Sequence, residues 1–204
     1  MPINPAKLLL KQGKTALLIC DIQTTFSAVT FEFDKMVANT VKLINACKLL
    51  NVPMIVTEQN PTVLGPTIPE FDVSGAEGPF RKKDFTMCVP EMKEALSKIC
   101  SGAPPDSVLL VGQEAHSCIE MTAAELTSDG IDVHAIADCI SSRSQEDRLY
   151  ALDRIKEIGC VLSTTESAIL KLVANADHPQ FKNIRDIIRP ITGPMGTVTT
   201  SKLS

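Results

Sequence analysis

Aromatic residues are scarce in this sequence, which has no tryptophan, one tyrosine and seven phenylalanines among its 204 residues. Positive charge is not in excess either, because 20 basic and 24 acidic side chains leave a formal net charge of -4. Nucleic-acid binding usually needs a basic face for the phosphates and aromatic rings on which bases can stack. The composition therefore argues against nucleic acid as a partner.

Motifs that would identify a common cofactor or nucleophile are also missing. The chain has neither the Gly-x-Gly-x-x-Gly fingerprint of dinucleotide binding nor the Gly-x-x-x-x-Gly-Lys-Ser/Thr phosphate loop. It lacks the Gly-x-Ser-x-Gly elbow of serine hydrolases. Its three histidines, His116, His134 and His178, show no metal-ligand spacing. We expect neither a cofactor nor a protein metal site.

Long hydrophobic runs are absent as well, and Leu8-Leu9-Leu10 near the N-terminus is too short to cross a membrane. The segment Met1 to Gly13 lacks the arginines of a transit peptide. We therefore expect a cytoplasmic protein without a membrane partner, with a mitochondrial location kept as the alternative. The tripeptide Ser201-Lys202-Leu203 matches a peroxisomal address, but Ser204 follows it and that signal is read only at the extreme C-terminus.

Short runs rich in valine, isoleucine and leucine alternate with longer segments of helical spacing along most of the chain. This alternation predicts an α/β fold with a doubly wound, mostly parallel sheet of about six strands and helices on both faces (Rossmann-like). We expect a single domain over residues 1–204, with its core at 14–190 and a flexible tail at 193–204. Strands are expected at 15–21, 53–58, 107–112, 132–138 and 160–163, and helices at 34–51, 89–101, 117–129, 147–159 and 166–175.

The seven cysteines are an odd number without any Cys-x-x-Cys pair, which favours a reduced compartment over a disulfide framework. Cys118 differs from the others because the segment from Gly112 to Cys118 leads from a buried strand into a helix. A helix N-terminus stabilises a thiolate, so this thiol is a candidate nucleophile, although a core thiol is the simpler interpretation of the pattern alone. We expect core packing for the other six, at positions 20, 47, 88, 100, 139 and 160.

Two charged residues near strand ends also need an explanation. Asp21 closes an apolar strand, where a buried carboxylate is costly unless it is hydrogen-bonded or charge-paired, so it is either a functional group or a helix N-cap. Lys82 lies beside Arg81 and Lys83, and by itself this run is typical of a solvated basic surface. In a doubly wound sheet, however, functional residues gather beyond the carboxyl ends of the strands.

Taken together, the motifs resemble those of the isochorismatase-like hydrolases, within the branch of isochorismatase-domain proteins. The resemblance covers residues 14–188 and depends on the joint order and spacing of its blocks rather than on any one of them. These blocks are LICDIQ at 18–23, TEQ at 57–59, LGPT at 64–67, KKDFT at 82–86, GQEAHSC at 112–118, DCISSRSQEDR at 138–148 and DHPQFK at 177–182.

The resemblance implies a cysteine hydrolase with a triad of Asp21, Lys82 and Cys118, which cleaves a C–N bond of a small amide through a thioester. Lys82 is preferred to Lys83 because of its spacing to Phe85 and to position 86, where threonine replaces the more usual serine. The strand order 3-2-1-4-5-6 of such folds places the first and fourth strands side by side. Asp21 and the loop bearing Cys118 would therefore meet in one crevice.

The same resemblance implies the surroundings of the nucleophile. The family has a non-prolyl cis peptide before the cysteine, which corresponds here to the Gln113–Glu114 bond. The backbone amides of Glu114 and Cys118 would then bind the developing oxyanion. Residues expected to line the substrate pocket are Gln23, Phe26, Gln59, Phe85, Glu114 and His116.

The sequence also departs from some relatives. Metal-dependent nicotinamidases of the same superfamily bind their metal through histidines after the second strand, whereas residues 57–61 read TEQNP, so that reaction is disfavoured. Family members commonly form dimers or larger assemblies, and we expect a homo-oligomer that acts on a small molecule. The competing interpretations are a binding protein without turnover and a redox-sensing thiol whose resolving partner is not visible in the sequence. A ribonuclease is less favoured because no basic patch is present.

Overall fold

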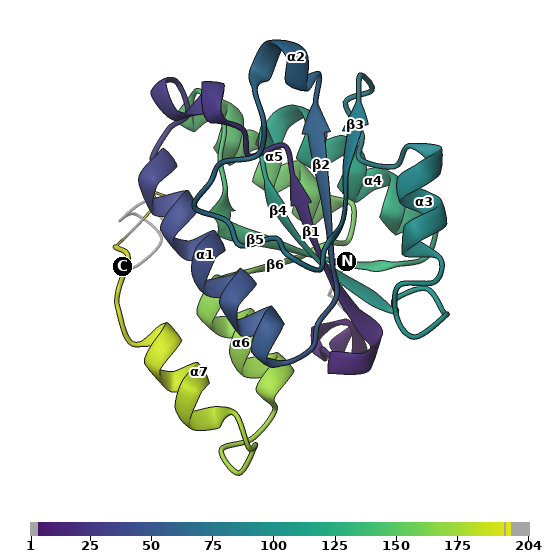
Figure 1. Ribbon diagram of the computed structural model, residues 1–204, viewed down its shortest axis with the longest axis vertical. Helices are drawn as coiled ribbons and strands as arrows, with labels where there is room; N and C mark the ends of the chain where they lie inside the picture. The colour runs from purple at the N-terminus through teal and green to yellow at the C-terminus, as the bar shows by residue number, and fades with distance from the viewer. Residues whose placement is uncertain (1–3, 194, 197–204) are drawn as a thin grey trace.

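A computed structural model describes residues 4–193, 195 and 196, and it has a parallel sheet of six strands (Figure 1). Neighbouring strands follow the order β3-β2-β1-β4-β5-β6, and every pairing is parallel. The predicted fold class and strand order are therefore confirmed. The strands are β1 (Thr15–Cys20), β2 (Met54–Gln59), β3 (Glu77–Lys82), β4 (Ser107–Gly112), β5 (Asp132–Ile140) and β6 (Val161–Ser163).

Helices cover both faces of this sheet (Figure 1). On one face lie α1 (Phe33–Leu49), α6 (Thr165–Val173) and α7 (Phe181–Ile188), and on the other lie α3 (Pro90–Leu96), α4 (Glu120–Ser128) and α5 (Gln145–Glu157). The short helix α2 (Pro61–Leu64) follows β2, and a π-helical turn, η4 (Ala115–Ile119), precedes α4. Three 3-10 turns complete the regular structure: η1 (Pro5–Leu8), η2 (Gln12–Lys14) and η3 (Thr24–Ala28). None of the described helices is both long enough and apolar enough to cross a membrane.

The central strands are buried on both sides, which explains why their sequences are continuous apolar runs rather than alternating ones. All six residues of β1 and of β4 are buried. Within β1, Leu17 and Ile19 belong to the core under α1, whereas Leu18 and Cys20 belong to the core under α3, α4 and α5. Each of these two central strands thus lies between two hydrophobic clusters.

Strand β3 and helix α7 were not anticipated from the sequence, and neither were the short helix α2 and the turns η1, η2 and η3. The edge strand β3 has the sequence EGPFRK and is mostly exposed, so it lacks the apolar signal of a buried strand. Its Pro79 is tolerated because edge strands do not need every backbone donor. Helix α7 lies beyond the last expected helix and buries only Ile184.

Element ends also differ from the expected ones by a few residues. Helix α5 begins two residues early, at Gln145, because the side chain of Ser144 accepts a hydrogen bond from the backbone of Asp147 and caps the helix. Helix α3 ends at Leu96 rather than at residue 101. Most of the tail expected at 193–204 lies outside the described residues.

The β1–β4 pairing brings together the two strand ends that lead into the candidate site. Cys20 at the end of β1 pairs with Gly112 at the end of β4. Gly112 has a φ of +127°, and a Cβ atom at this position would lie 2.0 Å from the carbonyl oxygen of Cys20. Only glycine fits, because the two backbones approach each other closely in a conformation that other residues rarely adopt.

Candidate active site

Asp21, Lys82 and Cys118 meet at the carboxyl ends of three strands. Asp21 directly follows β1, Lys82 is the last residue of β3, and Cys118 lies in η4 after β4. The ammonium nitrogen of Lys82 lies 2.6 Å from Oδ2 of Asp21 and 3.8 Å from Sγ of Cys118. The side chains of the ion pair are 0% and 1% exposed for Lys82 and Asp21, respectively. One buried cation therefore contacts both a carboxylate and a thiol.

The carboxylate of Asp21 has a partner on each oxygen. Its Oδ1 accepts a hydrogen bond of 2.8 Å from the hydroxyl of Thr57. Its Oδ2 accepts one from Lys82 and one from the thiol of Cys20, the latter at 3.4 Å. Charge pairing thus compensates the burial of this carboxylate. Asp21 does not cap a helix, which was the other explanation that the sequence offered.

The ammonium of Lys82 is held by further oxygens of the same loop region. It donates to Oε1 of Gln59 at 2.7 Å and to the carbonyls of Asp84 at 3.1 Å and Phe85 at 3.0 Å. Burial acts to lower the pKa of Lys82, but the acidic groups around it outweigh this effect and the pKa is raised. Lys82 is therefore a cation at neutral pH and not a solvated surface lysine.

Cys118 is chemically distinct from the other six thiols. Its pKa is lowered, first by a hydrogen bond with the thiol of Cys20 and then by the charge of Lys82, against the opposing effects of burial and Asp21. Burial raises the pKa of each of the other cysteines, to about 12 for Cys47. The Cys118 side chain is nearly buried, at 6% exposed. It is the thiol best suited to act as a nucleophile.

The loop before Cys118 contains the Gln113–Glu114 peptide bond in the cis form. Gln113 is fully buried, accepts a hydrogen bond of 2.9 Å from Thr30 and donates one of 3.3 Å to the carbonyl of Asp21. The carboxylate of Glu114 accepts two hydrogen bonds from Arg143, at 3.1 and 3.2 Å. These contacts tie the loop to β1 on one side and to the segment after β5 on the other.

Of the expected pocket residues, Gln59 and Phe85 contact the triad directly through their hydrogen bonds from Lys82. Gln23 contacts the backbone of Gln59 rather than the triad itself. Its side-chain amide donates to the carbonyls of Gln59 and Gly65, at 3.0 and 2.6 Å, and accepts from the backbone of Gln59 at 2.8 Å. Gln23 is fully buried and holds the loop after β2 in place.

The remaining candidates differ in position. Phe26 lies in η3 and packs against the hydrophobic core under α1. The ring nitrogen Nδ1 of His116 lies 3.0 Å from the hydroxyl of Ser142. The side chain of Phe85 is 56% exposed, so its carbonyl serves the site while its ring faces outward.

Two further residues of the site were missed in the sequence. Cys20 was assigned to core packing, and it does lie in the core, yet its thiol also donates to Oδ2 of Asp21 at 3.4 Å. Thr57 binds Asp21 because the β1–β2 pairing places it opposite Cys20. The position of Cys20 directly before Asp21 was a usable signal, whereas the role of Thr57 depends on a register that the sequence does not reveal.

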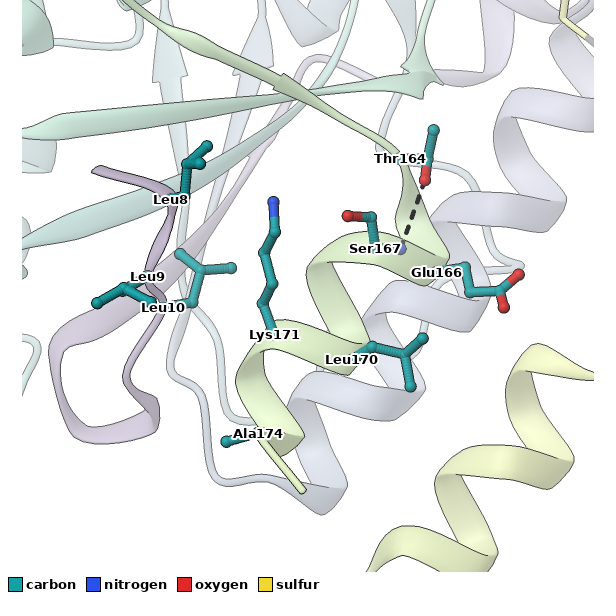
Figure 2. Close-up of a pocket in the computed structure, with 9 residues that line it drawn as sticks. All are labelled: Leu8, Leu9, Leu10, Thr164, Glu166, Ser167, Leu170, Lys171 and Ala174. Atoms are coloured by element: carbon teal, nitrogen blue, oxygen red, sulfur yellow. Dashed lines mark hydrogen bonds between the residues drawn. The ribbon is translucent and has the colours of Figure 1, made fainter. Parts of the chain in front are cut away.

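Other features of the described chain lie apart from this site. A pocket of about 700 Å³ opens between the N-terminal leucines and α6, and the side chain of Lys171 points into it (Figure 2). It shares no residue with the triad and its surroundings. Among the described residues, no group of three or more histidine, cysteine and acidic side chains is arranged to hold a metal ion.

Comparisons with known proteins identify the family of this chain. The isochorismatase domain family matches residues 15–167. Isochorismatase domain-containing protein 2 of Danio rerio is 44% identical over 176 residues, which cover 85% of this chain and 86% of that protein. The resemblance stated from the sequence motifs is therefore confirmed.

Solved structures give the same result. A structure described as MAR1 ribonuclease from Caenorhabditis elegans is 36% identical, covers 94% of this chain and 97% of its own, and superposes with a TM-score of 0.87. A structure from Escherichia coli, described as an octameric hydrolase of unknown specificity, shares the fold at 21% identity and a TM-score of 0.77, covering 88% and 90% of the two chains. Sheet order and sequence similarity together lead to one conclusion: the chain belongs to the isochorismatase domain family.

Proposed function

We propose that this protein is a cysteine hydrolase that cleaves a C–N bond of a small amide, with Cys118 as nucleophile and Asp21 and Lys82 as its partners. The observation that carries the proposal is the single buried ammonium of Lys82, which contacts both the Asp21 carboxylate and the Cys118 thiol. A nucleophile and a base held by a third group is the arrangement that covalent catalysis requires.

The reaction starts with the proton of the Cys118 thiol passing to Asp21. The thiolate then attacks the carbonyl carbon of the amide, and the backbone amides of Glu114 and Cys118 bind the oxyanion that forms. Asp21 returns the proton to the leaving nitrogen, and the C–N bond breaks to give a thioester on Cys118. Water, deprotonated by Asp21, hydrolyses the thioester and restores the thiol. Lys82 holds the carboxylate in place throughout these steps.

The burial of the site supports a small substrate. Cys118 is only 6% exposed, and Lys82 and Asp21 have almost no contact with solvent. A large polymer could not bring its backbone to this thiol without moving the surrounding loops. The dry surroundings also strengthen the attraction between the ammonium and the developing negative charge.

A homo-oligomer is part of the same proposal. The E. coli neighbour is described as octameric, and this chain exposes several large apolar side chains, including Leu9, Val63 and Tyr150. Light scattering on the purified protein tests this part, and a mass that stays at that of one chain across a range of concentrations contradicts it.

The test of the activity is a panel of small amides assayed with the wild type, Cys118→Ser and the control variant Cys139→Ala, which removes a buried thiol on the other face of the sheet. We expect turnover by the wild type and the control and none by Cys118→Ser. When the wild type is quenched during turnover, its intact mass should show an acyl adduct on Cys118. Full activity of Cys118→Ser contradicts the mechanism.

The name of the C. elegans structure makes single-stranded RNA a necessary second substrate in the same assay. We expect no cleavage, because this chain has a net charge of -4 and its candidate nucleophile is buried. RNA cleavage that is lost in Cys118→Ser would instead favour a ribonuclease. Rapid alkylation of Cys118 without turnover of any amide would favour a binding protein.

A further inference from the structure

We propose that Cys20 and Cys118 are a redox pair: a hydroperoxide converts them to a disulfide that blocks the nucleophile, and a thiol reductant reverses the change. The bond formation itself does not depend on the hydrolase activity. Only the loss of turnover rests on the proposed function.

The first support is that both thiols contact the same buried ion pair. Cys20 ends β1 and donates to Oδ2 of Asp21 at 3.4 Å, whereas Cys118 lies in η4 and its sulfur lies 3.8 Å from the ammonium of Lys82. Both reduced side chains belong to the hydrophobic cluster under α3, α4 and α5. Gly112 has no side chain and therefore leaves space beside Cys20. A Cβ atom at position 112 would lie 2.9 Å from the Cβ of Cys20.

The other cysteines have different partners. The thiol of Cys139 lies 3.1 Å from the hydroxyl of Thr165, and that of Cys160 lies 3.3 Å from the hydroxyl of Thr127. Cys100 donates to the carbonyl of Thr15 at 3.9 Å. None of these three contacts is with the Asp21–Lys82 ion pair, which Cys20 and Cys118 both touch.

The surroundings give the two thiols unequal reactivity. Lys82 lies 3.8 Å from the sulfur of Cys118 and stabilises its thiolate, which is the form that reacts with peroxide. Cys20 is fully buried and donates to Oδ2 of Asp21 at 3.4 Å, so it stays protonated until a base removes its proton. Cys118 is thus oxidised first, and Cys20 is the resolving thiol.

The chemistry balances in two steps. The Cys118 thiolate attacks one oxygen of hydrogen peroxide, which breaks the O–O bond, oxidises the sulfur to a sulfenic acid and releases hydroxide. Cys20 passes its proton by way of Asp21 to the sulfenic oxygen, and its sulfur attacks the sulfur of Cys118. The S–S bond forms as the S–O bond breaks and water leaves. In sum, two thiols and one peroxide give one disulfide and two waters.

The pair also protects the nucleophile. A sulfenic acid without a nearby thiol is oxidised further to the sulfinic acid, which ordinary thiols do not reduce. A disulfide stops the oxidation at a reversible stage. The structure thereby supplies the resolving partner that a redox-sensing thiol needs.

The experiment treats the full-length wild type with a small excess of hydrogen peroxide and measures intact mass, labelling of free thiols and activity. Digestion with trypsin and then with a glutamate-specific protease separates the thiols, because cleavage after Glu114 and Glu120 frees Cys118 from Cys100 and Cys139. We expect a mass loss of about 2 Da and a crosslinked Cys20–Cys118 peptide. Activity should fall more than about tenfold and return with dithiothreitol.

Three variants make the result specific. Cys20→Ser keeps a small polar side chain, and Cys20→Ala is a second choice if that variant folds poorly. In both, peroxide should add about 32 Da at Cys118 and the loss of activity relative to the untreated variant should not be reversible. Cys139→Ala should behave like the wild type.

A wild type that accumulates sulfinic acid at Cys118 without a Cys20–Cys118 peptide overturns the proposal, and so does a disulfide from Cys118 to another cysteine. If the disulfide forms but no amide is hydrolysed under any condition, the redox pair stands and the proposed hydrolase function fails. If amides are hydrolysed but no disulfide forms, the reverse holds.

Discussion

Lys82 and Asp21 form an ion pair of 2.6 Å from which solvent is excluded, and the same ammonium reaches the sulfur of Cys118 at 3.8 Å. Buried pairs of this kind contribute little net stability when they are compared with apolar residues, because both charges lose their hydration. Removing only one partner is far more damaging, since the other charge is then left buried alone.

We therefore expect Lys82→Met to destabilise the protein by about 3–5 kcal/mol and to reduce amide hydrolysis by at least about a hundredfold. The double variant Asp21→Asn/Lys82→Met should be more stable than Lys82→Met alone, because no unpaired charge remains. Urea unfolding and initial rates measure both effects. The matched control is Lys83→Met, the exposed neighbour, which should change stability by less than about 0.5 kcal/mol. Equal losses of stability and activity in Lys82→Met and Lys83→Met would contradict the assignment of Lys82 to the site.

The thiol of Cys20 leads to a prediction about the reactivity of Cys118. The pKa of Cys118 is lowered first by the neighbouring thiol of Cys20 and next by the charge of Lys82, so Cys20→Ala should raise the pKa of Cys118. The rate of alkylation by iodoacetamide as a function of pH should shift to higher pH. At neutral pH the rate should fall about three- to tenfold, and at high pH the two profiles should converge because both thiols are then ionised.

Peptide mapping shows which cysteine carries the label. Cys139→Ala should leave the profile of Cys118 unchanged, because Cys139 lies in the core on the other face of the sheet. If Cys20→Ala labels at the wild-type rate at every pH, Cys20 does not influence the nucleophile.

The parallel sheet could be predicted from the sequence because β1 and β4 are buried on both faces and appear as uninterrupted apolar runs, whereas the strand order followed from the resemblance to the isochorismatase-like hydrolases. Strand β3 escaped prediction because it is an exposed edge strand whose residues satisfy no apolar pattern. The role of Cys20 escaped for a different reason. A cysteine inside a buried strand looks like any small hydrophobic residue, and only the pairing of β1 with β4 and the hydrogen bond to Asp21 show that its thiol lies at the candidate site.

The close approach of β1 and β4 at Gly112 predicts a large effect of a very small substitution. Gly112→Ala would place a methyl group 2.0 Å from the carbonyl oxygen of Cys20, at a φ of +127° that alanine rarely adopts. We expect a loss of about 3 kcal/mol or more in the free energy of unfolding, measured by urea denaturation, and a displaced Cys118 loop with reduced activity. Gly13→Ala is the matched control, because a Cβ atom there meets nothing within 4 Å. A Gly112→Ala protein as stable as Gly13→Ala would show that the strands can separate at no cost.

His134 predicts how stability depends on acid. This residue lies in the middle of β5 and is fully buried, and burial followed by the charge of Lys171 lowers its pKa to about 4. In the unfolded chain a histidine has a pKa of about 6.5, so between these values the unfolded state binds a proton that the folded state does not. The stabilisation from a neutral His134 is complete above pH of about 6.5 and is lost as the pH falls toward about 4, to a total of about 3 kcal/mol.

The measurement that isolates this effect is the free energy of unfolding of the wild type and His134→Gln at several pH values across that window. Carboxylates common to both proteins cancel in the difference, so the wild type should lose stability relative to the variant as the pH falls. A difference that stays constant with pH would mean that His134 is protonated equally in the folded and unfolded chains. In that case the charged ring must have a partner inside the fold, and His134 would not be neutral in the folded protein.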